Sequence, residues 1–385
     1  MNILVLGAGL MGRAIAFDLL NHSICSEVTV LDGKKECLEE SEHYLPKDAS
    51  ISFYHEDVTD DKVIDSFFSK ADLVISAVPY LFNVQLTRLA IKNHCHFIDL
   101  GGNNTVVEHQ KQMFKDAKEA EVTIIPDSGL APGLVSILTK KLVDEYGHLS
   151  RVKLRVGGLP KYPKDPWKYQ LVFSANGLIN EYVEDAIVLD HEQIKTIPSL
   201  TCCEEIDFPE PFGTLEAFTT SGGCSTLPYT YQKSIDYLDY KTIRYPGHLQ
   251  QIKPLFDLGL DNINKIQVKD SMIAPRDVLI QMLHNTLPND GEDVVLLKVI
   301  GETIQDGEQV RISYEMIDYY DVNTKLSAMM RTTGFPVSIT AGLILKDIIQ
   351  QRGVFTPEEI IPPEIFLNEL QKRNILIKKI VETIS

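Results

Sequence analysis

The sequence has no run of about 18 apolar residues, so we predict no helix that crosses a membrane. Basic residues are also scarce: 37 lysines and arginines stand against 54 aspartates and glutamates, for a formal net charge of −17. Nucleic acids and anionic membranes bind basic surfaces, so this charge argues against either as a partner. The first residues, MNILVLGAG, contain no basic segment and no cleavage site, which argues against a signal peptide.

Cysteine is rare as well. Only six of the 385 residues are cysteines, and no two of them form a CxxC pair. Scattered cysteines in a chain of this size are typical of reduced thiols, so we expect a cytoplasmic protein without a metal site. The length itself predicts two domains, because domains usually contain about 100–200 residues.

The first part of the chain alternates between two kinds of segment. Short apolar runs, typical of strands buried on both faces, are separated by segments with helical periodicity. This alternation predicts a doubly wound parallel α/β sheet, a Rossmann fold, over residues 1–130. The expected strands are 2–6, 27–31, 51–54, 73–78, 96–100 and 122–125, and the expected helices are about 11–21, 61–69, 83–94 and 106–120.

The pattern changes after Gly133. A helix to about residue 146 is followed by strands between long polar loops, which indicates a second, α+β domain over 131–334 with a mixed or antiparallel sheet. Helices at 335–352 and 363–372 are expected to complete the first domain, as part of a C-terminal segment of about 335–385. Within the second domain we expect strands at 151–157, 183–189, 266–273 and 294–304, helices near 249–257 and 275–285, and a hairpin turn at 318–321.

A glycine-rich turn follows the first expected strand. Gly7, Gly9 and Gly12 match the GxGxxG pattern, with Leu10 and Met11 between the last two glycines. Between a strand and a helix, the first glycine allows a tight turn, the second lets a pyrophosphate approach the backbone and the third permits close packing. The N-terminus of the following helix then attracts the anion. We therefore predict a dinucleotide-binding site.

Asp32 ends the second expected strand. A carboxylate at this position accepts a hydrogen bond from the ribose 2′-hydroxyl of NAD and repels the 2′-phosphate of NADP. Lys34 and Lys35 follow closely and could weaken that preference. The sequence therefore favours NAD over NADP as the cofactor.

Further cofactor contacts are expected where later strands end. Asp57 and Val58 follow the third strand, where the adenine usually lies in this fold, and Val78 and Pro79 follow the fourth. Ligands bind beyond the carboxyl edge of such sheets, so Tyr80 is a candidate for contact with the nicotinamide ribose or the substrate. An ordinary half-buried loop tyrosine is an equally good interpretation of Tyr80.

Six motifs are spread over nearly the whole chain. They are VLGAG at 5–9, DLVISAVP at 72–79, DSGLAPG at 127–133, VGGLP at 156–160, TIRYPGH at 242–248 and RTTGFP at 331–336. Together they resemble the saccharopine dehydrogenase-like family, which includes saccharopine reductases, carboxynorspermidine dehydrogenases and lysine 6-dehydrogenases. Each motif is modest evidence, but all six occur in the family's order.

Within this family the chain is most similar to the lysine 6-dehydrogenase branch, through DLGGN at 99–103 and LEAFTTSGG at 215–223 followed by STLP at 225–228. Saccharopine reductases carry an acid where Ala131 stands, a cysteine where Val156 stands and an arginine-containing segment where 221–226 stands. These departures argue against binding of saccharopine, which is a tricarboxylate. They suit a smaller substrate with one carboxylate.

The resemblance implies an NAD-dependent dehydrogenase that oxidises the ε-amine of L-lysine. A hydride passes from the carbon bearing the amine to NAD, the imine hydrolyses to an aldehyde, and the aldehyde cyclises to a piperideine carboxylate. The family also implies a homodimer or homotetramer formed through the second domain, which would bind the small amino-acid substrate. Two alternatives remain open: a saccharopine or carboxynorspermidine dehydrogenase, and a non-catalytic Rossmann protein that senses NAD(P)H.

This chemistry requires a proton acceptor, because the lysine ε-amine has a pKa of about 10.4 and must be neutral to release hydride. His248 is a candidate base, since histidine titrates near neutral pH. Asp99 and Asp127 each end a Rossmann strand, so either could hold an ammonium group or orient water. Helix capping and turn formation are their alternatives. Tyr80 completes the catalytic candidates.

Arg244 is the candidate clamp for the substrate's α-carboxylate, because a guanidinium group binds carboxylates in a bidentate manner. A structural salt bridge is its alternative. Asn103, Gly158 and Thr332 are the other candidates for substrate binding. Asn103 could instead serve a loop turn, and Thr332 a helix N-cap.

Overall fold

The computed structural model describes residues 1–45, 50–288 and 291–384, which form two compact units. Unit 1 contains Met1–Glu145, Ser225–Thr230 and Met330–Ile375. Unit 2 contains Tyr146–Cys224, Tyr231–Met329 and the C-terminal residues from Leu376. The first boundary therefore follows Glu145, whereas the sequence pattern places it at residue 130. A short segment from the middle of the chain, 225–230, also belongs to unit 1.

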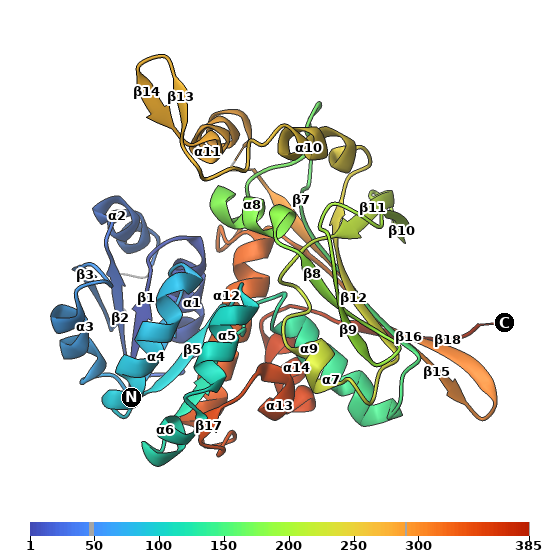
Figure 1. Ribbon diagram of the computed structural model, residues 1–385. Helices are drawn as coiled ribbons and strands as arrows, with labels where there is room; N and C mark the ends of the chain where they lie inside the picture. The colour runs from blue at the N-terminus through green and yellow to red at the C-terminus, as the bar shows by residue number, and fades with distance from the viewer. Residues whose placement is uncertain (46–49, 289–290, 385) are drawn as a thin grey trace. The chain divides into compact units, whose positions relative to one another are not determined.

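Unit 1 is built on a sheet of seven parallel strands in the order β17-β6-β5-β4-β1-β2-β3 (Figure 1). The order runs outward from β1 in both directions, so the carboxyl ends of β1 and β4 form the switch point where such sheets bind ligands. The strands are β1 (Asn2–Leu6), β2 (Glu27–Asp32), β3 (Ile51–His55), β4 (Leu73–Ser76), β5 (His96–Asp99), β6 (Thr123–Ile125) and β17 (Gly353–Val354).

Helices connect these strands and bury apolar side chains against them. Phe68, Phe97 and Ile124 lie in one apolar core of this unit, together with Leu6 and Val74. The helix expected over 106–120 is divided into two. The connections are α1 (Leu10–Asn21), α2 (Lys35–Tyr44), α3 (Asp61–Phe68), the 3₁₀ turn η1 (Tyr80–Phe82), α4 (Asn83–Lys92), α5 (Asn104–Lys111) and α6 (Phe114–Glu119), and α7 (Leu134–Tyr146) follows β6.

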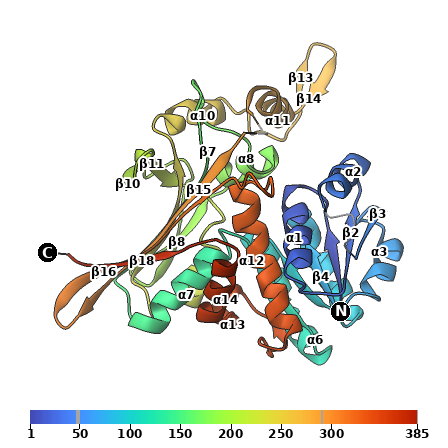
Figure 2. The same cartoon turned by 180° about the vertical axis from the view of Figure 1, so that it is seen from behind.

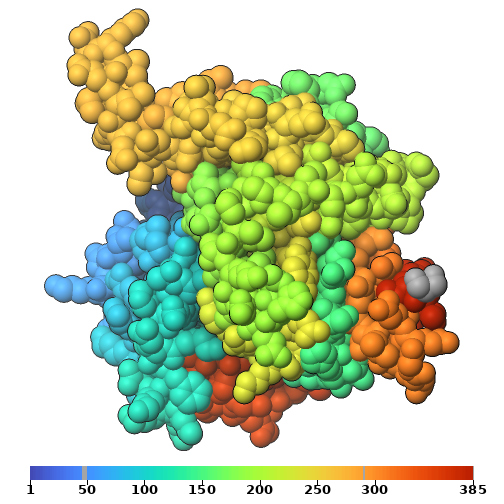
Figure 3. Space-filling model, turned by 45° about the vertical axis from the view of Figure 1, so that its right-hand side comes forward, coloured from blue at the N-terminus to red at the C-terminus, as the bar shows by residue number. Residues whose placement is uncertain are grey.

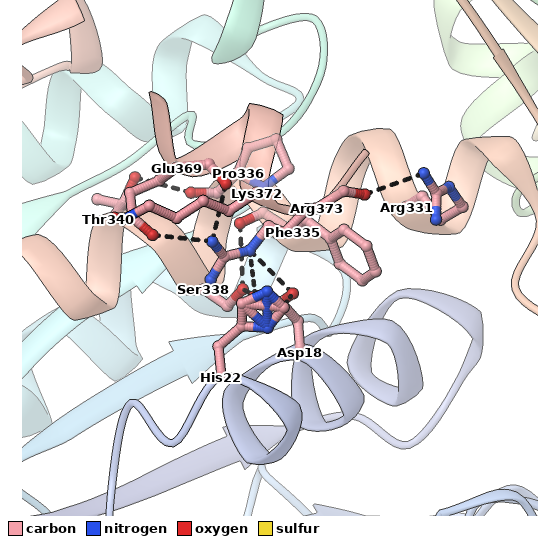
Figure 4. A network of polar contacts seen from close by, with 10 residues as sticks. All are labelled: Asp18, His22, Arg331, Phe335, Pro336, Ser338, Thr340, Glu369, Lys372 and Arg373. Carbon is pink, nitrogen blue, oxygen red and sulfur yellow. Dashed lines mark hydrogen bonds and ion pairs between the residues drawn. The ribbon is translucent and has the colours of Figure 1, made fainter. Parts of the chain in front are cut away.

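The C-terminal helices α12 (Ala328–Leu345), α13 (Pro357–Ile360) and α14 (Pro363–Lys372) contribute most of their residues to unit 1. Arg373, just after α14, donates to both carboxylate oxygens of Asp18 in α1, at 2.8 and 2.9 Å, and Ser338 of α12 donates to the same carboxylate (Figure 4). A Cβ on Gly334 would lie 2.8 Å from Cβ of Ala14. The buried ion pair and this close approach hold α12 and the residue after α14 against the helix that follows the glycine loop.

The start of α12 differs from the expected helix at 335–352. The side chain of Asp293 accepts hydrogen bonds from the N–H groups of Ala328 and Met329, at 2.6 and 2.9 Å. A carboxylate that accepts from the first N–H groups of a helix stabilises its N-terminus. The helix therefore begins seven residues earlier than the pattern predicts, and Pro336 lies inside it.

Unit 2 contains a nine-stranded mixed sheet, which confirms the prediction of a Rossmann fold followed by an α+β domain. The main order is β10-β11-β12-β7-β15-β16-β18, while β8 pairs with β12 and β9. Strands β7 and β12 are parallel, and the other described pairs are antiparallel. The strands are β7 (Arg151–Pro160), β8 (Ala186–Asp190), β9 (Gln193–Ile197), β10 (Glu204–Phe208), β11 (Gly213–Thr219), β12 (Tyr237–Arg244), β15 (Asp293–Gln305), β16 (Glu308–Tyr319) and β18 (Lys378–Thr383).

Three expectations for local structure are wrong. The single strand expected at 266–273 is a separate hairpin of β13 (Ile266–Val268) and β14 (Ser271–Ile273), which protrudes from the surface (Figure 3). Lys269, with a φ of +53°, and Asp270 make its turn. The turn expected at 318–321 is not there, because β16 continues through Tyr319. Residues 378–383, expected to lie in the C-terminal segment that completes the first domain, instead form β18 of unit 2, which pairs with β16 (Figure 2).

The described helices of unit 2 are α8 (Ala175–Val183), α10 (His248–Asp257) and α11 (Pro275–Thr286), and the short α9 (Leu227–Thr230) belongs to unit 1. None of the described helices has the length and apolar character that a membrane crossing requires.

Candidate functional site

The glycine loop between β1 and α1 is shaped by two positions where only glycine fits. Gly7 has a φ of +101°, which residues with a Cβ rarely adopt, and a Cβ there would lie 2.8 Å from the carbonyl oxygen of Ala77. A Cβ on Gly12 would lie 1.8 Å from the carbonyl oxygen of Gly7. The two glycines therefore allow a tight turn and the close approach of α1 to the loop.

Gly9 is different, because its Cβ would meet nothing within 4 Å. It is the N-cap residue of α1, and within the described chain no side chain caps this helix and no acidic residue occupies its first turn. Leu10 in that turn is 40% exposed. Open space beside Gly9 and uncapped N–H groups fit the pyrophosphate of a dinucleotide.

Asp32 lies at the end of β2 and is bound to this loop. Its carboxylate accepts hydrogen bonds from the N–H of Ala8 and the N–H of Lys34, both at 2.7 Å. These bonds fix a negative charge beside the glycine turn. Lys35 forms an ion pair with Glu39 at 3.3 Å, so its charge is partly neutralised within α2.

The other expected cofactor residues differ in exposure. Asp57 is exposed and accepts hydrogen bonds from the N–H and hydroxyl of Thr59, which lower the pKa of its carboxyl group. Val58 lies in the apolar core of unit 1, which limits it to packing. Val78 is half-buried, and its Cγ1 lies 3.3 Å from where a Cβ on Gly7 would be. Pro79 is exposed and precedes η1.

Asp99 ends β5 and is fully buried. Its carboxylate accepts hydrogen bonds from Gln110 Nε2 at 2.7 Å, from the N–H of Gly101 at 2.8 Å and from the N–H of Asp127 at 3.3 Å. Burial raises its pKa to about 6, although these three donors lower it. Asp99 therefore organises the loops after β5 and β6, and its acceptor sites are largely used.

Asp127 follows β6 and is only 2% exposed. It has a φ of +60°, and the hydroxyl of Ser225 donates a hydrogen bond to its Oδ2. Among the described atoms, Oδ1 has no hydrogen-bond partner. Burial above all, together with the charges of Asp99 and Glu358, raises the pKa of this carboxyl group to about 8. Asp127 can therefore hold or release a proton near neutral pH.

A closely packed loop surrounds Asp127. A Cβ on Gly101 would lie 1.8 Å from its Oδ1, and one on Gly102 would lie 3.3 Å from the ring of Tyr80. Tyr80, a candidate catalytic residue, is half-buried and lies near this loop through that contact. Asn103 caps α5 by accepting a hydrogen bond from the N–H of Val106 at 3.3 Å.

Two remaining substrate candidates lie at packed positions. Thr332 is fully buried inside α12, so the alternative of an N-cap is wrong for this residue. Gly158 is on β7, and a Cβ there would lie 2.5 Å from Cε of Met329 and 3.0 Å from Cγ2 of Val172. Close packing thus requires a glycine at this position.

In unit 2, Arg244 ends β12 and is only 3% exposed. Its Nη1 donates to the carbonyl oxygen of Ile243 at 2.9 Å, and its Nε donates to the hydroxyl of Tyr182 at 3.0 Å. The guanidinium carbon lies 4.8 Å from the ring centre of Tyr169 and 5.8 Å from that of Tyr182. Within the described chain, no carboxylate lies within 4.0 Å of the guanidinium nitrogens.

His248 begins α10 and belongs to the same cluster. Its Nε2 lies 3.1 Å from the hydroxyl of Tyr182. Because Arg244 can only donate, the Tyr182 oxygen accepts from it, whereas the direction of the bond between Tyr182 and His248 depends on the histidine tautomer. Burial, with the charge of Arg244, lowers the pKa of His248 to about 3. Such a histidine is a weak base, so this geometry favours a role in orienting Tyr182 and, through it, Arg244.

Three polar residues of these clusters did not stand out in the sequence. Ser225 contacts Asp127 across 98 positions of the chain, and only its place in the STLP segment hinted at a role. Tyr182 and its neighbour Glu181 lie on α8, beside Arg244. The segment ANGLINEYV, which forms α8, contains no motif that connects it with Arg244. The sequence therefore could not place Glu181 and Tyr182 near that arginine.

Over the described residues, no three His, Cys, Asp or Glu side chains are grouped to hold a metal ion. All six cysteines are free.

Comparison with known proteins places this arrangement in a family. Residues 3–125 match the model of the saccharopine dehydrogenase NADP binding domain, and residues 129–376 match that of the saccharopine dehydrogenase C-terminal domain. The chain belongs to the saccharopine dehydrogenase family. This family member is accordingly an NAD(P)-dependent amino-acid dehydrogenase, and the residues that match the NADP binding domain belong to the Rossmann sheet of unit 1.

Its curated relatives are distant. Saccharopine dehydrogenase [NADP(+), L-glutamate-forming] of Pyricularia oryzae is 27% identical over 67% of this chain, which spans only 57% of that relative. The enzyme of the same name from Saccharomyces cerevisiae is 23% identical over 92% of this chain and 93% of its own length. The bovine mitochondrial alpha-aminoadipic semialdehyde synthase is 22% identical, and this chain spans 45% of it.

Solved structures share the fold. Apo saccharopine dehydrogenase (L-Glu forming) from Saccharomyces cerevisiae matches with a TM-score of 0.79 at 21% identity, over 100% of both chains. The homospermidine synthase of Legionella pneumophila in complex with NAD matches with a TM-score of 0.70 at 14% identity, over 99% of this chain and 91% of that one.

Proposed function

We propose that this family member is an NAD-dependent dehydrogenase that deaminates the ε-amine of L-lysine oxidatively. The observation that carries the proposal is Arg244, a buried guanidinium group with no described carboxylate within 4.0 Å of its nitrogens. A buried charge is costly unless it is paired. A substrate carboxylate supplies the missing partner, and one arginine suits a substrate with one carboxylate better than a tricarboxylate.

Asp127 is the proposed proton acceptor. Lysine presents an ammonium group that must lose a proton before its carbon can release hydride. Asp127 carries a buried carboxyl group with a pKa of about 8 and an Oδ1 without a hydrogen-bond partner among the described atoms. A carboxylate with a raised pKa is a stronger base than an exposed one, so it accepts the ammonium proton more readily. Asp99 positions the loop on which Asp127 lies.

The proposed cofactor is NAD. Gly7, Gly9 and Gly12 would hold its pyrophosphate, and the bound nicotinamide supplies the hydride acceptor. The carboxylate of Asp32, fixed by the N–H groups of Ala8 and Lys34, would accept from the ribose 2′-hydroxyl and repel a 2′-phosphate. The family model and curated relatives name NADP, so the proposed preference for NAD rests on Asp32 alone.

The test is the reduction of NAD and of NADP by purified protein with L-lysine, followed by absorbance at 340 nm. We expect NADH formation with lysine, and a loss of about tenfold to a hundredfold in kcat/KM for Arg244→Met, because a charged hydrogen-bonded partner is removed. Replacement of an exposed arginine, Arg151→Met, should leave kcat/KM unchanged.

The names of the curated relatives support a second candidate, a saccharopine-type dehydrogenase. Absence of turnover with lysine, together with NAD(P)H oxidation in the presence of an aldehyde and an amino acid, would establish that candidate instead. Cofactor binding without turnover across an amine panel would point to an NAD(P)H sensor. The homodimer or homotetramer and the cytoplasmic location remain predictions.

A further inference from the structure

Glu181, on α8 next to Tyr182, carries a side chain that forms no hydrogen bond and no ion pair with any described residue. It is half-buried. Its charge interacts with Arg244 although the two groups are farther apart than the 4.0 Å of an ion pair. Burial raises the pKa of Glu181 to about 7, more than Arg244 lowers it. The carboxylate is thus held near a cation without reaching it.

Glu181 and Arg244 are each held by contacts with other residues. The carbonyl oxygen of Glu181 accepts a hydrogen bond from the N–H of Ser221 at 2.9 Å, which fixes α8 to the segment after β11. Arg244 is restrained by the carbonyl of Ile243 and the hydroxyl of Tyr182. These two bonds use Nε and Nη1, so Nη2 has no hydrogen-bond partner among the described residues and is available for a ligand.

The nearby carboxylate of Glu216 does not compete for the same role. Glu216 on β11 accepts hydrogen bonds from the N–H groups of Gly247 and Leu249, at 2.9 and 2.7 Å. It is therefore occupied in fixing the start of α10. Around Arg244 the remaining walls are aromatic, formed by Tyr169 and Tyr182.

We infer that Glu181 and Arg244 form a recognition site for the zwitterion of an α-amino acid, with Arg244 on the α-carboxylate and Glu181 on the α-ammonium group. A molecule that carries both charges on one carbon supplies an anionic partner for Arg244 and a cationic partner for Glu181. A simple carboxylate or a simple amine supplies only one of the two. The inference rests on the proposed function for its choice of an amino-acid substrate. It adds that selectivity depends on the α-amino group, remote from the amine that is oxidised.

The test measures binding of three non-reactive ligands to the protein saturated with NADH, by calorimetry: L-norleucine, hexanoate and hexylamine. Trp167, the only tryptophan of the chain, packs against the core that contains Tyr169 and Tyr182, so its fluorescence without cofactor is a second readout. We expect norleucine to bind at least about tenfold more tightly than either single-charge ligand, as charge-assisted hydrogen bonds imply.

Variants separate the two halves of the site. Glu181→Gln should weaken norleucine about tenfold and leave hexanoate unchanged, so that the two affinities become similar. Arg244→Met should weaken norleucine and hexanoate but not hexylamine. Asp185→Asn, which removes an exposed charge just beyond α8, is the matched control and should change none of them. Circular dichroism checks that each variant is folded.

Two results would overturn the inference: no binding of norleucine by calorimetry or fluorescence, or an unchanged preference for norleucine over hexanoate in folded Glu181→Gln. The proposed function fails separately. If norleucine binds with the expected preference but lysine is not oxidised, the zwitterion site stands and the lysine reaction is wrong. If lysine is oxidised while Glu181→Gln keeps the preference, only the role of Glu181 is wrong.

Discussion

Replacement of Asp127 by asparagine should stabilise the protein at alkaline pH while abolishing its activity. In the folded protein the pKa of this carboxyl group is about 8, against 3.8 for an exposed aspartate. Between these values the folded state binds a proton that the unfolded state does not. The wild-type protein therefore loses stability as the pH rises from about 4 to about 8. An amide carries no such proton, and asparagine tolerates the φ of +60° at this position.

The magnitude follows from the pKa difference. Each pH unit corresponds to 1.36 kcal/mol at most, and relaxation of a buried site reduces the total, so we expect about 2–3 kcal/mol between pH 5 and pH 8. The measured quantity is the free energy of unfolding of Asp127→Asn minus that of the wild type, from urea titrations at both pH values. This difference should become more favourable to the variant by that amount at pH 8.

A matched control is Asp99→Asn, since Asp99 is equally buried but accepts from three donors. There an amide would direct its NH₂ group at N–H donors, so the variant should be less stable than the wild type at both pH values. The activity of Asp127→Asn should fall by a factor of about 100 or more, as expected when a general base is removed. An Asp127→Asn stability difference that is equal at pH 5 and pH 8 would refute the assigned pKa, and retained activity would refute the role as proton acceptor.

Three further predictions concern unit 1. Asp32→Ser should improve the Kd for NADPH about tenfold and weaken that for NADH, measured by fluorescence titration, because the repulsive carboxylate is removed; an unchanged ratio would exclude Asp32 from cofactor selection. Gly12→Ala should destabilise the protein by about 2–3 kcal/mol and abolish NADH binding, because the Cβ meets the Gly7 carbonyl oxygen; calorimetry that shows normal binding would contradict the loop assignment. Arg373→Met should cost about 3–5 kcal/mol in urea unfolding by leaving Asp18 buried without its partner, whereas exposed Arg88→Met should cost nothing measurable.

Much of the first unit could be predicted from the sequence because strands such as β1, β4 and β6 are buried on both faces. Such strands are continuous apolar runs, as in Ile3–Leu6 of β1, and each is followed within a few residues by a helix. The cofactor loop is also contiguous, so the glycines and Asp32 could be identified by spacing alone. The first residue of α12 could not be predicted in this way, because the start of the helix depends on Asp293, which lies 35 positions earlier in the chain.

The second unit contains strands that the pattern missed for an electrostatic reason. Half of the residues of β12, YLDYKTIR, are charged or polar, yet seven of its eight residues are buried. Asp239 on this strand forms an ion pair with Arg155 of β7 at 2.9 Å, and Lys241 pairs with Glu204 of β10 at 3.1 Å. Arg155 also pairs with Glu204, at 2.5 Å. Because these charges are paired, the strand can be buried although its sequence is polar. A prediction that expects buried strands to be apolar therefore misses β12.

The two candidate site residues with buried charge differ in how they can be neutralised. Asp127 can remove its own charge by taking up a proton, which its raised pKa near 8 reflects. Arg244 cannot, because its pKa lies far above the physiological range and its surroundings raise that pKa further. Aromatic rings contribute only about 0.5–2 kcal/mol to a cation of this kind. Arg244 is therefore the stronger support for an anionic ligand in unit 2, because a guanidinium ion cannot release its proton and Glu181 interacts with it only from beyond the 4.0 Å of an ion pair.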